Sequence, residues 1–232
     1  MTSTPAAIIF DLDGCLVDSE PLSIGAIVEV AHEMGVSHVT FDDIRARFLG
    51  VSMRVICAEL TRSTGQAAYA EFVDRVETRL FTTYKERLRQ IDGVVAMLLT
   101  LKQNNIAMAV ATGGSIRRMN ETLLISGLAP WFENTAFSAD QVEHGKPAPD
   151  LFLFAAAELR VPADKCVVLE DSPHGVRGAV DAGMRVVGFV GGSHLEGMRK
   201  AHTELLISKG ADTVAGTLMD ALAAFLPDEM RV

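Results

Sequence analysis

Four short apolar runs recur along the chain: AAIIF (6–10), IAMAVA (106–111), CVVL (166–169) and RVVGF (185–189). Each run has the length of a strand and is apolar on both faces, as central strands of a parallel sheet are. The segments before the last three runs carry helical patterns. Because strands that alternate with helices form βα units, we expect an α/β fold with a doubly wound, Rossmann-like parallel sheet.

One long segment interrupts this alternation between the first and second runs. From about Glu20 to Arg89 the chain shows helical patterns and no convincing strand. Ser19 is typical of a helix start, the residues from Thr40 to Asp43 of a capping box, and Ser52 of a further helix cap. We therefore predict two parts: a core formed by residues 1–17 and 90–232, and an inserted α-helical cap domain at residues 18–89.

The composition allows a sizeable core, since the chain has 232 residues of which 49% are hydrophobic. Its formal net charge is -9 and it has no Lys/Arg-rich run, which argues against nucleic acid or a membrane surface as partner. Cys15, Cys57 and Cys166 are far apart, which indicates a reducing compartment rather than disulfides or a zinc site. No segment approaches the ~20 apolar residues that span a bilayer. We expect a cytoplasmic monomer.

Polar residues follow each predicted strand, at the carboxyl edge where a parallel sheet binds its ligands. Each set alone fits an ordinary turn or helix start, but their shared position after successive strands favours one functional site. The sets are Asp11 and Asp13, then Thr112-Gly113-Gly114-Ser115, then Glu170-Asp171-Ser172, and Gly145-Lys146-Pro147 after a weaker strand at 136–138.

The residue types in these sets indicate the chemistry. Four carboxylates at one edge repel one another unless a cation lies among them, and an all-oxygen set suits a hard ion such as Mg²⁺. The Thr112 hydroxyl and the amides of Gly113 and Gly114 form a cradle for a phosphate, and Lys146 adds a charge for the same anion. A metal, a cradle and a carboxylate able to attack predict phosphoryl transfer through an aspartyl-phosphate.

The stretches DLDGCLVDSE, VATGGS, HGKPAPD and VLEDSPHGVRGAVDAGM resemble, in this order, the four motifs of the haloacid dehalogenase superfamily. With its helical segment between the first two motifs, the chain resembles the β-phosphoglucomutase-like phosphatases of that superfamily, which carry a helical cap there. The resemblance covers essentially the whole chain. It implies that the protein is a phosphatase whose substrate is a small phosphate monoester.

The resemblance also implies a role for each motif residue. Asp11 is then the nucleophile and Asp13 the general acid and base, while Thr112 and Lys146 hold the phosphoryl group. Mg²⁺ is bound by Asp11, Glu170, Asp171 and the backbone carbonyl of Asp13.

Three rival functions remain to be weighed. A dehalogenase needs no proton donor for its halide, and here an acid stands at position 13. A signalling receiver module also gathers acids, a hydroxyl and a lysine after successive strands, but it has no large helical insert after its first acid and lacks the DxD spacing. A β-phosphoglucomutase carries a histidine in the first cap helix, where this chain has Ser23. We therefore favour a phosphatase.

The cap is expected to select the substrate. Gly50 to Arg54 resembles the family's substrate-facing loop with its arginine offset by one place, so Arg54 and Arg47 are candidate substrate contacts. Few aromatics and these arginines indicate a sugar, sugar-acid or polyol phosphate rather than a nucleotide. Cys15 stands where the family has Thr or Val, and its role is left open between packing and a reactive thiol.

Overall fold

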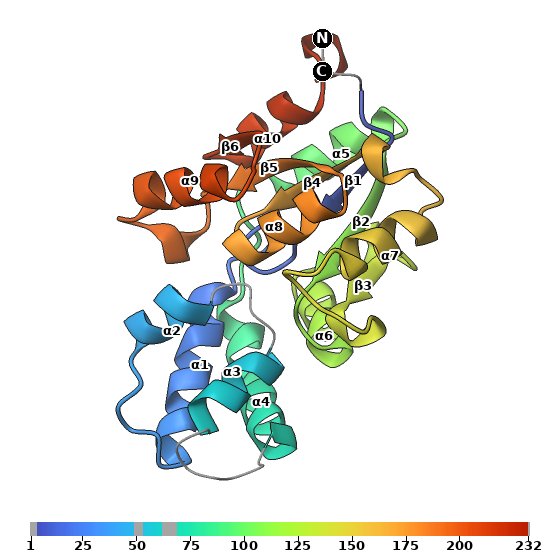
Figure 1. Cartoon of the computed structure of the whole chain (residues 1–232). Coiled ribbons are helices and arrows are strands. Elements are labelled where there is room, and N and C mark those ends of the chain that lie inside the picture. The colour runs from blue at the N-terminus through green and yellow to red at the C-terminus, as the bar shows by residue number, and fades with distance from the viewer. Residues whose placement is uncertain (1–3, 49–52, 62–68, 232) are drawn as a thin grey trace.

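A parallel sheet forms the centre of the molecule in the computed structural model, which describes residues 4–48, 53–61 and 69–231. Within that part of the chain, six strands lie in the order β3-β2-β1-β4-β5-β6 (Figure 1). The predicted doubly wound sheet is confirmed, and the sequence analysis missed only the last of these strands. Their bounds are β1 Ala7–Phe10, β2 Ala107–Thr112, β3 Ala136–Ser138, β4 Cys166–Glu170, β5 Arg185–Phe189 and β6 Thr213–Ala215.

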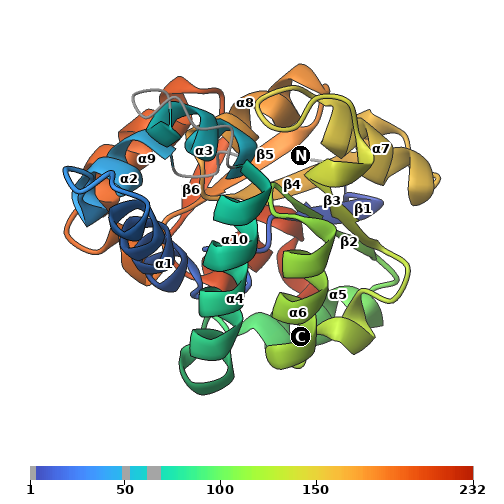
Figure 2. The same cartoon turned by 90° about the horizontal axis from the view of Figure 1, so that it is seen from below.

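Helices cover both faces of the sheet because its strands are apolar on both sides. Ile8 and Phe10 face one apolar cluster, to which α5, α6, α10 and the helical segment contribute, whereas Ala7 and Ile9 face a second cluster with α7, α8 and α9. Figure 2 shows α5 and α6 on one side of the strands and α7 and α8 on the other. The bounds are α5 Val94–Gln103, α6 Ile116–Ile125, α7 Asp150–Glu158, α8 Pro173–Asp181, α9 Arg199–Ser208 and α10 Leu218–Phe225.

The segment between β1 and α5 is helical, as predicted, and its helices lie together beside one end of the sheet (Figure 1). Glu33 of α1 pairs with Arg75 at 2.5 Å and with Arg79 at 2.7 Å on α4, so these two helices lie side by side. The capping box at Thr40 is confirmed, whereas Ser52 lies outside the described residues. The bounds are α1 Glu20–Glu33, α2 Phe41–Phe48, α3 Met53–Thr61 and α4 Tyr69–Arg87.

The chain crosses between the helical segment and the sheet twice, and the two crossings lie side by side. Val17 bridges Gln90, and the amide of Asp18 donates to the Arg89 carbonyl at 2.9 Å. Ser19 precedes α1 as predicted, but no hydrogen bond from its side chain caps that helix. The division of the chain into residues 18–89 and the remainder stays a prediction.

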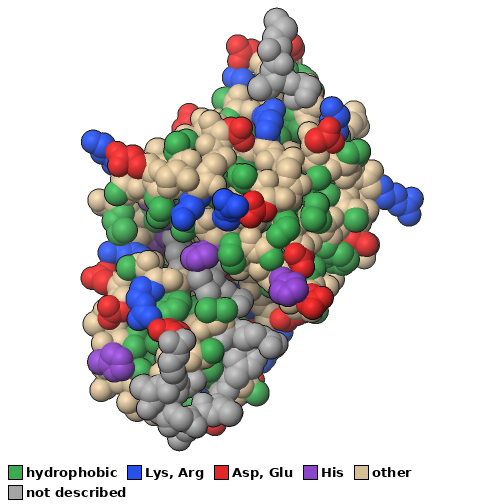
Figure 3. Space-filling view, in the orientation of Figure 1, with side chains coloured by type: hydrophobic (Ala, Val, Ile, Leu, Met, Phe, Trp, Pro, Cys, Tyr) green, Lys and Arg blue, Asp and Glu red, His purple; other side chains and the backbone are tan. Residues whose placement is uncertain are grey.

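The surface carries charges of both signs. On the face drawn in Figure 3, the acidic and basic side chains of the described residues are interspersed rather than gathered by sign. In the described part of the chain, no helix is both long and apolar enough to cross a membrane.

Candidate active site

The register of the sheet brings the predicted motifs to one edge. Phe10 pairs with Val110 of β2 and with Leu169 of β4, so the residues that follow these positions emerge together. Asp11 comes directly after β1, Thr112 ends β2 and Glu170 ends β4. Segments far apart in the sequence therefore meet at the carboxyl end of the sheet, as the sequence analysis predicted.

Lys146 lies between two of the acids. Its ammonium Nζ is 2.5 Å from Asp11 Oδ1 and 2.7 Å from Glu170 Oε1, and all three side chains are buried. Burial acts to lower the pKa of Lys146, but the two carboxylates outweigh it and raise that pKa. The lysine therefore stays charged and joins the third and fourth motifs to the first.

The acids around Lys146 fit a divalent cation. Asp11, Glu170 and Asp171 place carboxylate oxygens within 4.8 Å of one another, together with the sulfur of Cys15. Burial raises the pKa values of Asp11 and Asp171 well above the ordinary value, and the neighbouring carboxylates add to this rise while Lys146 opposes it. Three carboxylates against one ammonium leave two negative charges, which a divalent cation would balance.

Asp13 is held by a different set of partners. Ser19 Oγ donates to its Oδ1 at 2.5 Å, and Arg118 Nη2 lies 2.8 Å from the same oxygen. Oδ2 is 3.4 Å from Thr112 Oγ1. The Asp13 side chain is not among the clustered metal-ligand atoms, so a metal contact through its backbone carbonyl stays a prediction.

The predicted anion cradle lies at the start of α6. The amide of Gly114 donates to Thr112 Oγ1 at 3.1 Å, and Ser115 Oγ accepts from the Arg118 amide at 3.0 Å as the helix cap. Thr112, Gly113 and Gly114 line the same pocket as Asp11 and Asp13. A helix N-terminus and glycine backbone beside two acids form a suitable place for a phosphate.

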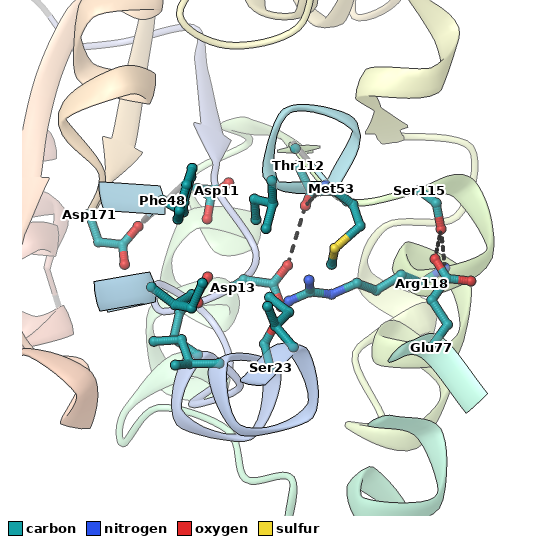
Figure 4. A pocket seen from close by; sticks show the side chains of 17 residues that line it. Asp11, Asp13, Ser23, Phe48, Met53, Glu77, Thr112, Ser115, Arg118 and Asp171 are labelled. Atoms are coloured by element: carbon teal, nitrogen blue, oxygen red, sulfur yellow. Dashed lines mark hydrogen bonds and ion pairs between the residues drawn. The ribbon is translucent and has the colours of Figure 1, made fainter. Parts of the chain in front are cut away.

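The pocket lies between the helical segment and the sheet edge (Figure 4). Its far wall is apolar, and Ser23, Glu20 and Glu77 add polar groups from the helical segment. Ser115 Oγ donates to Glu77 Oε1 at 2.5 Å, so the two sides of the pocket touch at this point. The apolar residues are Ile24, Ile27, Ile44, Phe48, Met53 and Ile56.

Of the two arginines predicted to contact substrate, Arg47 is not brought to this pocket. Arg47 pairs with Glu59 at 2.8 Å and lines another hollow, with His38 and Asp43. Arg54 belongs to α3, and its side chain lies outside the described residues. Ser23 does lie at the pocket, where it is buried.

Sequence reasoning missed Arg118, which the structure places against Asp13. Burial acts to lower the pKa of its guanidinium, but the Asp13 carboxylate outweighs it and raises that pKa. Its position in the first turn after the anion cradle was a usable signal, because that turn faces the same edge of the sheet. Glu77 and Glu20 carried no such signal, since only the packing of the helical segment brings them to the pocket.

Cys15 and two histidines surround the carboxylate group. Cys15 is fully buried, and burial among the acids raises the pKa of its thiol well above the ordinary value. His194 Nε2 is 3.0 Å from Asp171 Oδ2, and His202 Nε2 is 2.6 Å from the Asp171 carbonyl oxygen. Burial lowers the pKa of both histidines, so both favour the neutral form.

Comparison with known proteins agrees with this geometry. The family model of haloacid dehalogenase-like hydrolases matches residues 8–189. A phosphorylated carbohydrates phosphatase of Thermotoga maritima is 34% identical over 186 residues, which cover 79% of this chain and 85% of that protein.

Two further similarities concern a longer protein and a solved structure. The chloroplastic protein SUPPRESSOR OF QUENCHING 1 of Arabidopsis thaliana is 34% identical over 199 residues, which are 78% of this chain but only 17% of that protein. The crystal structure of a putative beta-phosphoglucomutase from Thermotoga maritima superposes with a TM-score of 0.69 at 30% identity, covering 95% of this chain and 99% of that one.

Proposed function

Because this chain belongs to the haloacid dehalogenase-like hydrolases, we propose that it is a Mg²⁺-dependent phosphatase acting on a small phosphorylated carbohydrate. The observation that carries the proposal is the joint placement of Asp11, Asp13 and the anion cradle on one pocket. Family membership also removes the receiver-module alternative, since a receiver is not a hydrolase. A monomeric state and a cytoplasmic location stay predictions.

In the first step of the proposed reaction, the Asp11 carboxylate attacks phosphorus and the bond to the substrate oxygen breaks. Asp13 gives its proton to the departing alkoxide, and an aspartyl-phosphate remains. Ser19 and Arg118 both engage Asp13 Oδ1, so Oδ2 is the oxygen that exchanges the proton. In the second step Asp13 takes a proton from water, and the water oxygen forms a bond to phosphorus as the bond from phosphorus to Asp11 breaks. Inorganic phosphate leaves and the Asp11 carboxylate is regenerated.

The remaining motif residues hold the charge of the transferring group. Thr112 and the backbone of Gly113 and Gly114 bind the phosphoryl oxygens, and Lys146 keeps the Asp11 carboxylate in place. Glu170 and Asp171, with Asp11 and the Asp13 carbonyl, would hold Mg²⁺. When bound, Mg²⁺ offsets negative charge on the phosphoryl group.

The described residues of the pocket favour a phosphate whose sugar or polyol part carries no charge over the phosphate of a sugar acid, which carries a carboxylate. Among the described residues that line the pocket, Arg118 is the one cationic side chain, and it is already paired with Asp13. Glu20 and Glu77 would repel a carboxylate on the substrate but can accept hydrogen bonds from hydroxyl groups.

Phosphate release measured over a panel of sugar, polyol and sugar-acid phosphates, with and without Mg²⁺, tests the proposal. We expect Asp11→Asn to lower turnover by roughly 10⁴-fold or more, because it removes the nucleophile. The exposed Asp164→Asn serves as the matched control and should retain full turnover. A folded Asp11→Asn variant with near-normal turnover would refute the scheme.

A mutase is the alternative that the same site allows. Ser23 supports the phosphatase, because a serine hydroxyl cannot exchange protons near neutral pH as a histidine can. Incubation with β-glucose 1-phosphate separates the two functions. Inorganic phosphate is the expected product, and accumulation of glucose 6-phosphate would identify a mutase.

A further inference from the structure

Cys15 lies inside the carboxylate group rather than beside it. Its sulfur and the oxygens of Asp11, Glu170 and Asp171 are all within 4.8 Å of one another, and the residue is fully buried. Donor atoms around a tetrahedral ion such as Zn²⁺, with bonds of about 2.0–2.3 Å, are separated by roughly 3.3–3.8 Å. The four side chains therefore need only small shifts to share one cation.

The turn that carries Cys15 is packed directly against Asp171. Gly14 has a φ of +79°, and its amide donates to the Val17 carbonyl at 2.8 Å. A Cβ atom at Gly14 would lie 2.2 Å from Asp171 Oδ2, so only glycine allows this approach. The close packing of the backbone delivers the next residue, Cys15, to the metal-binding acids.

Asp171 provides an independent sign of an incomplete coordination site. Asp171 is 2% exposed, and its Oδ2 accepts no hydrogen bond from any described residue. His194 Nε2 lies 3.0 Å from this oxygen without forming a hydrogen bond to it. Lys146 meanwhile engages Asp11 Oδ1 and Glu170 Oε1. A buried carboxylate oxygen without a hydrogen bond, next to a thiol, is a place for a cation.

We propose that Cys15 adds a thiolate ligand to this site, so that thiophilic divalent cations such as Cd²⁺ and Zn²⁺ bind there in competition with Mg²⁺. On binding, the S–H bond breaks, the sulfur–metal bond forms, and the proton leaves to solvent. Sulfur favours soft ions whereas Mg²⁺ prefers oxygen, so Cys15 selects between the two classes of metal. The inference rests on the metal site of the proposed function.

The experiment titrates the Mg²⁺-free protein with Cd²⁺ and records the ultraviolet charge-transfer absorption of a cadmium–thiolate bond. The wild type should develop this band with one Cd²⁺ per chain. Cys15→Ser and Cys15→Thr should lack the band and bind Cd²⁺ at least about tenfold more weakly, while their Mg²⁺ affinity changes less. Cys166→Ser, whose thiol lies at the other end of β4, is the control that keeps the band.

Each outcome tests whether Cys15 is a metal ligand, and none of these measurements depends on turnover. A band that persists in both Cys15 variants, or equal Cd²⁺ affinity in wild type and variants, overturns it. If neither variant folds, the wild type alone decides, because a protein that binds Cd²⁺ without the thiolate band contradicts the inference. A chain that shows the band but releases no phosphate from any substrate would keep the metal inference and refute the phosphatase.

Discussion

At the scale of single residues, the site depends on how Asp13 is held. Ser19 and Arg118 both meet its Oδ1, and the Arg118 side chain is only 10% exposed. A buried ion pair of this kind is costly to break on one side, because the remaining charge is left without compensation. We therefore regard Arg118 as a positioning residue that orients Asp13 for proton transfer.

Replacing Arg118 should affect turnover more than substrate binding. In Arg118→Met the Asp13 carboxylate loses its partner, and we expect kcat to fall by about 10²-fold, as a displacement of about 1 Å in a catalytic group does. KM should change little, and Arg118→Lys should restore part of kcat. Steady-state kinetics test this with Arg177→Met as the control, since Arg177 is exposed and pairs with Asp181. Equal kcat values for the two methionine variants would contradict the positioning role.

His202 should make stability depend on pH. Burial lowers its folded-state pKa below the ordinary value of 6.5, despite the hydrogen bond to the Asp171 carbonyl. The unfolded chain therefore binds more protons below pH 6.5, so the free energy of unfolding falls as pH drops from about 6.5 towards the folded-state pKa. His202→Gln should show a shallower fall in denaturant titrations at a series of pH values. An unchanged slope in His202→Gln would contradict the assignment.

At the scale of elements, helix starts are packed directly onto the acids that end the strands. Ser172 caps α8, and its amide donates to Glu170 Oε2 at 2.8 Å. Gly175 in the first turn of α8 leaves room for Glu170, since a Cβ there would lie 1.5 Å from Oε1. The contact between β4 and α8 thus fixes the Glu170 carboxylate before any metal binds.

Gly175→Ala should damage both stability and metal binding. The added methyl must displace Glu170, and such overpacking costs about 1–3 kcal/mol. Mg²⁺ affinity should fall with it, because a metal ligand moves. Gly25→Ala in α1 is the matched control: nothing lies within 4 Å of its added Cβ, so it should gain about 0.5–1 kcal/mol. Denaturant unfolding with and without Mg²⁺ checks both, and a Gly175→Ala variant as stable as wild type would show that Glu170 can move freely.

At the scale of the whole molecule, the pocket is lined by both the sheet edge and the helical segment, whereas the metal-binding acids all come from the sheet. Asp11 and Asp171 follow strands of the sheet, and Glu170 ends one. The opposite wall of the pocket comes from the helical segment, and the Ser115–Glu77 and Arg117–Asp74 contacts join α6 to α4. Metal binding should therefore stabilise the sheet region without requiring a substrate.

Mg²⁺ should raise the thermal and denaturant stability of the intact chain. A ligand that binds the folded state alone at 100 times its Kd adds about 2.7 kcal/mol, and chelation with EDTA should remove this gain. Asp171→Asn should be insensitive to Mg²⁺, whereas the exposed Asp181→Asn should respond as the wild type does. A response to Mg²⁺ that survives in Asp171→Asn would place the binding site elsewhere.

The sequence by itself determined the sheet, the helical insert and the motif residues at the carboxyl edge. Apolar runs of strand length and capped helical patterns are local signals, and parallel pairing then brings the ends of the strands together whatever the details of packing. β6 was missed because it has only three residues, of which Thr213 is exposed and Val214 is half-buried, and they form no apolar run.

Tertiary structure alone decided which side chains surround the motifs. Glu77 meets Ser115, and Arg47 pairs with Glu59 and lies away from the pocket. The position of Cys15 against Asp171 likewise depends on the close approach that Gly14 allows. Such contacts join residues far apart in the chain, and they depend on side-chain packing across elements, which no local pattern encodes.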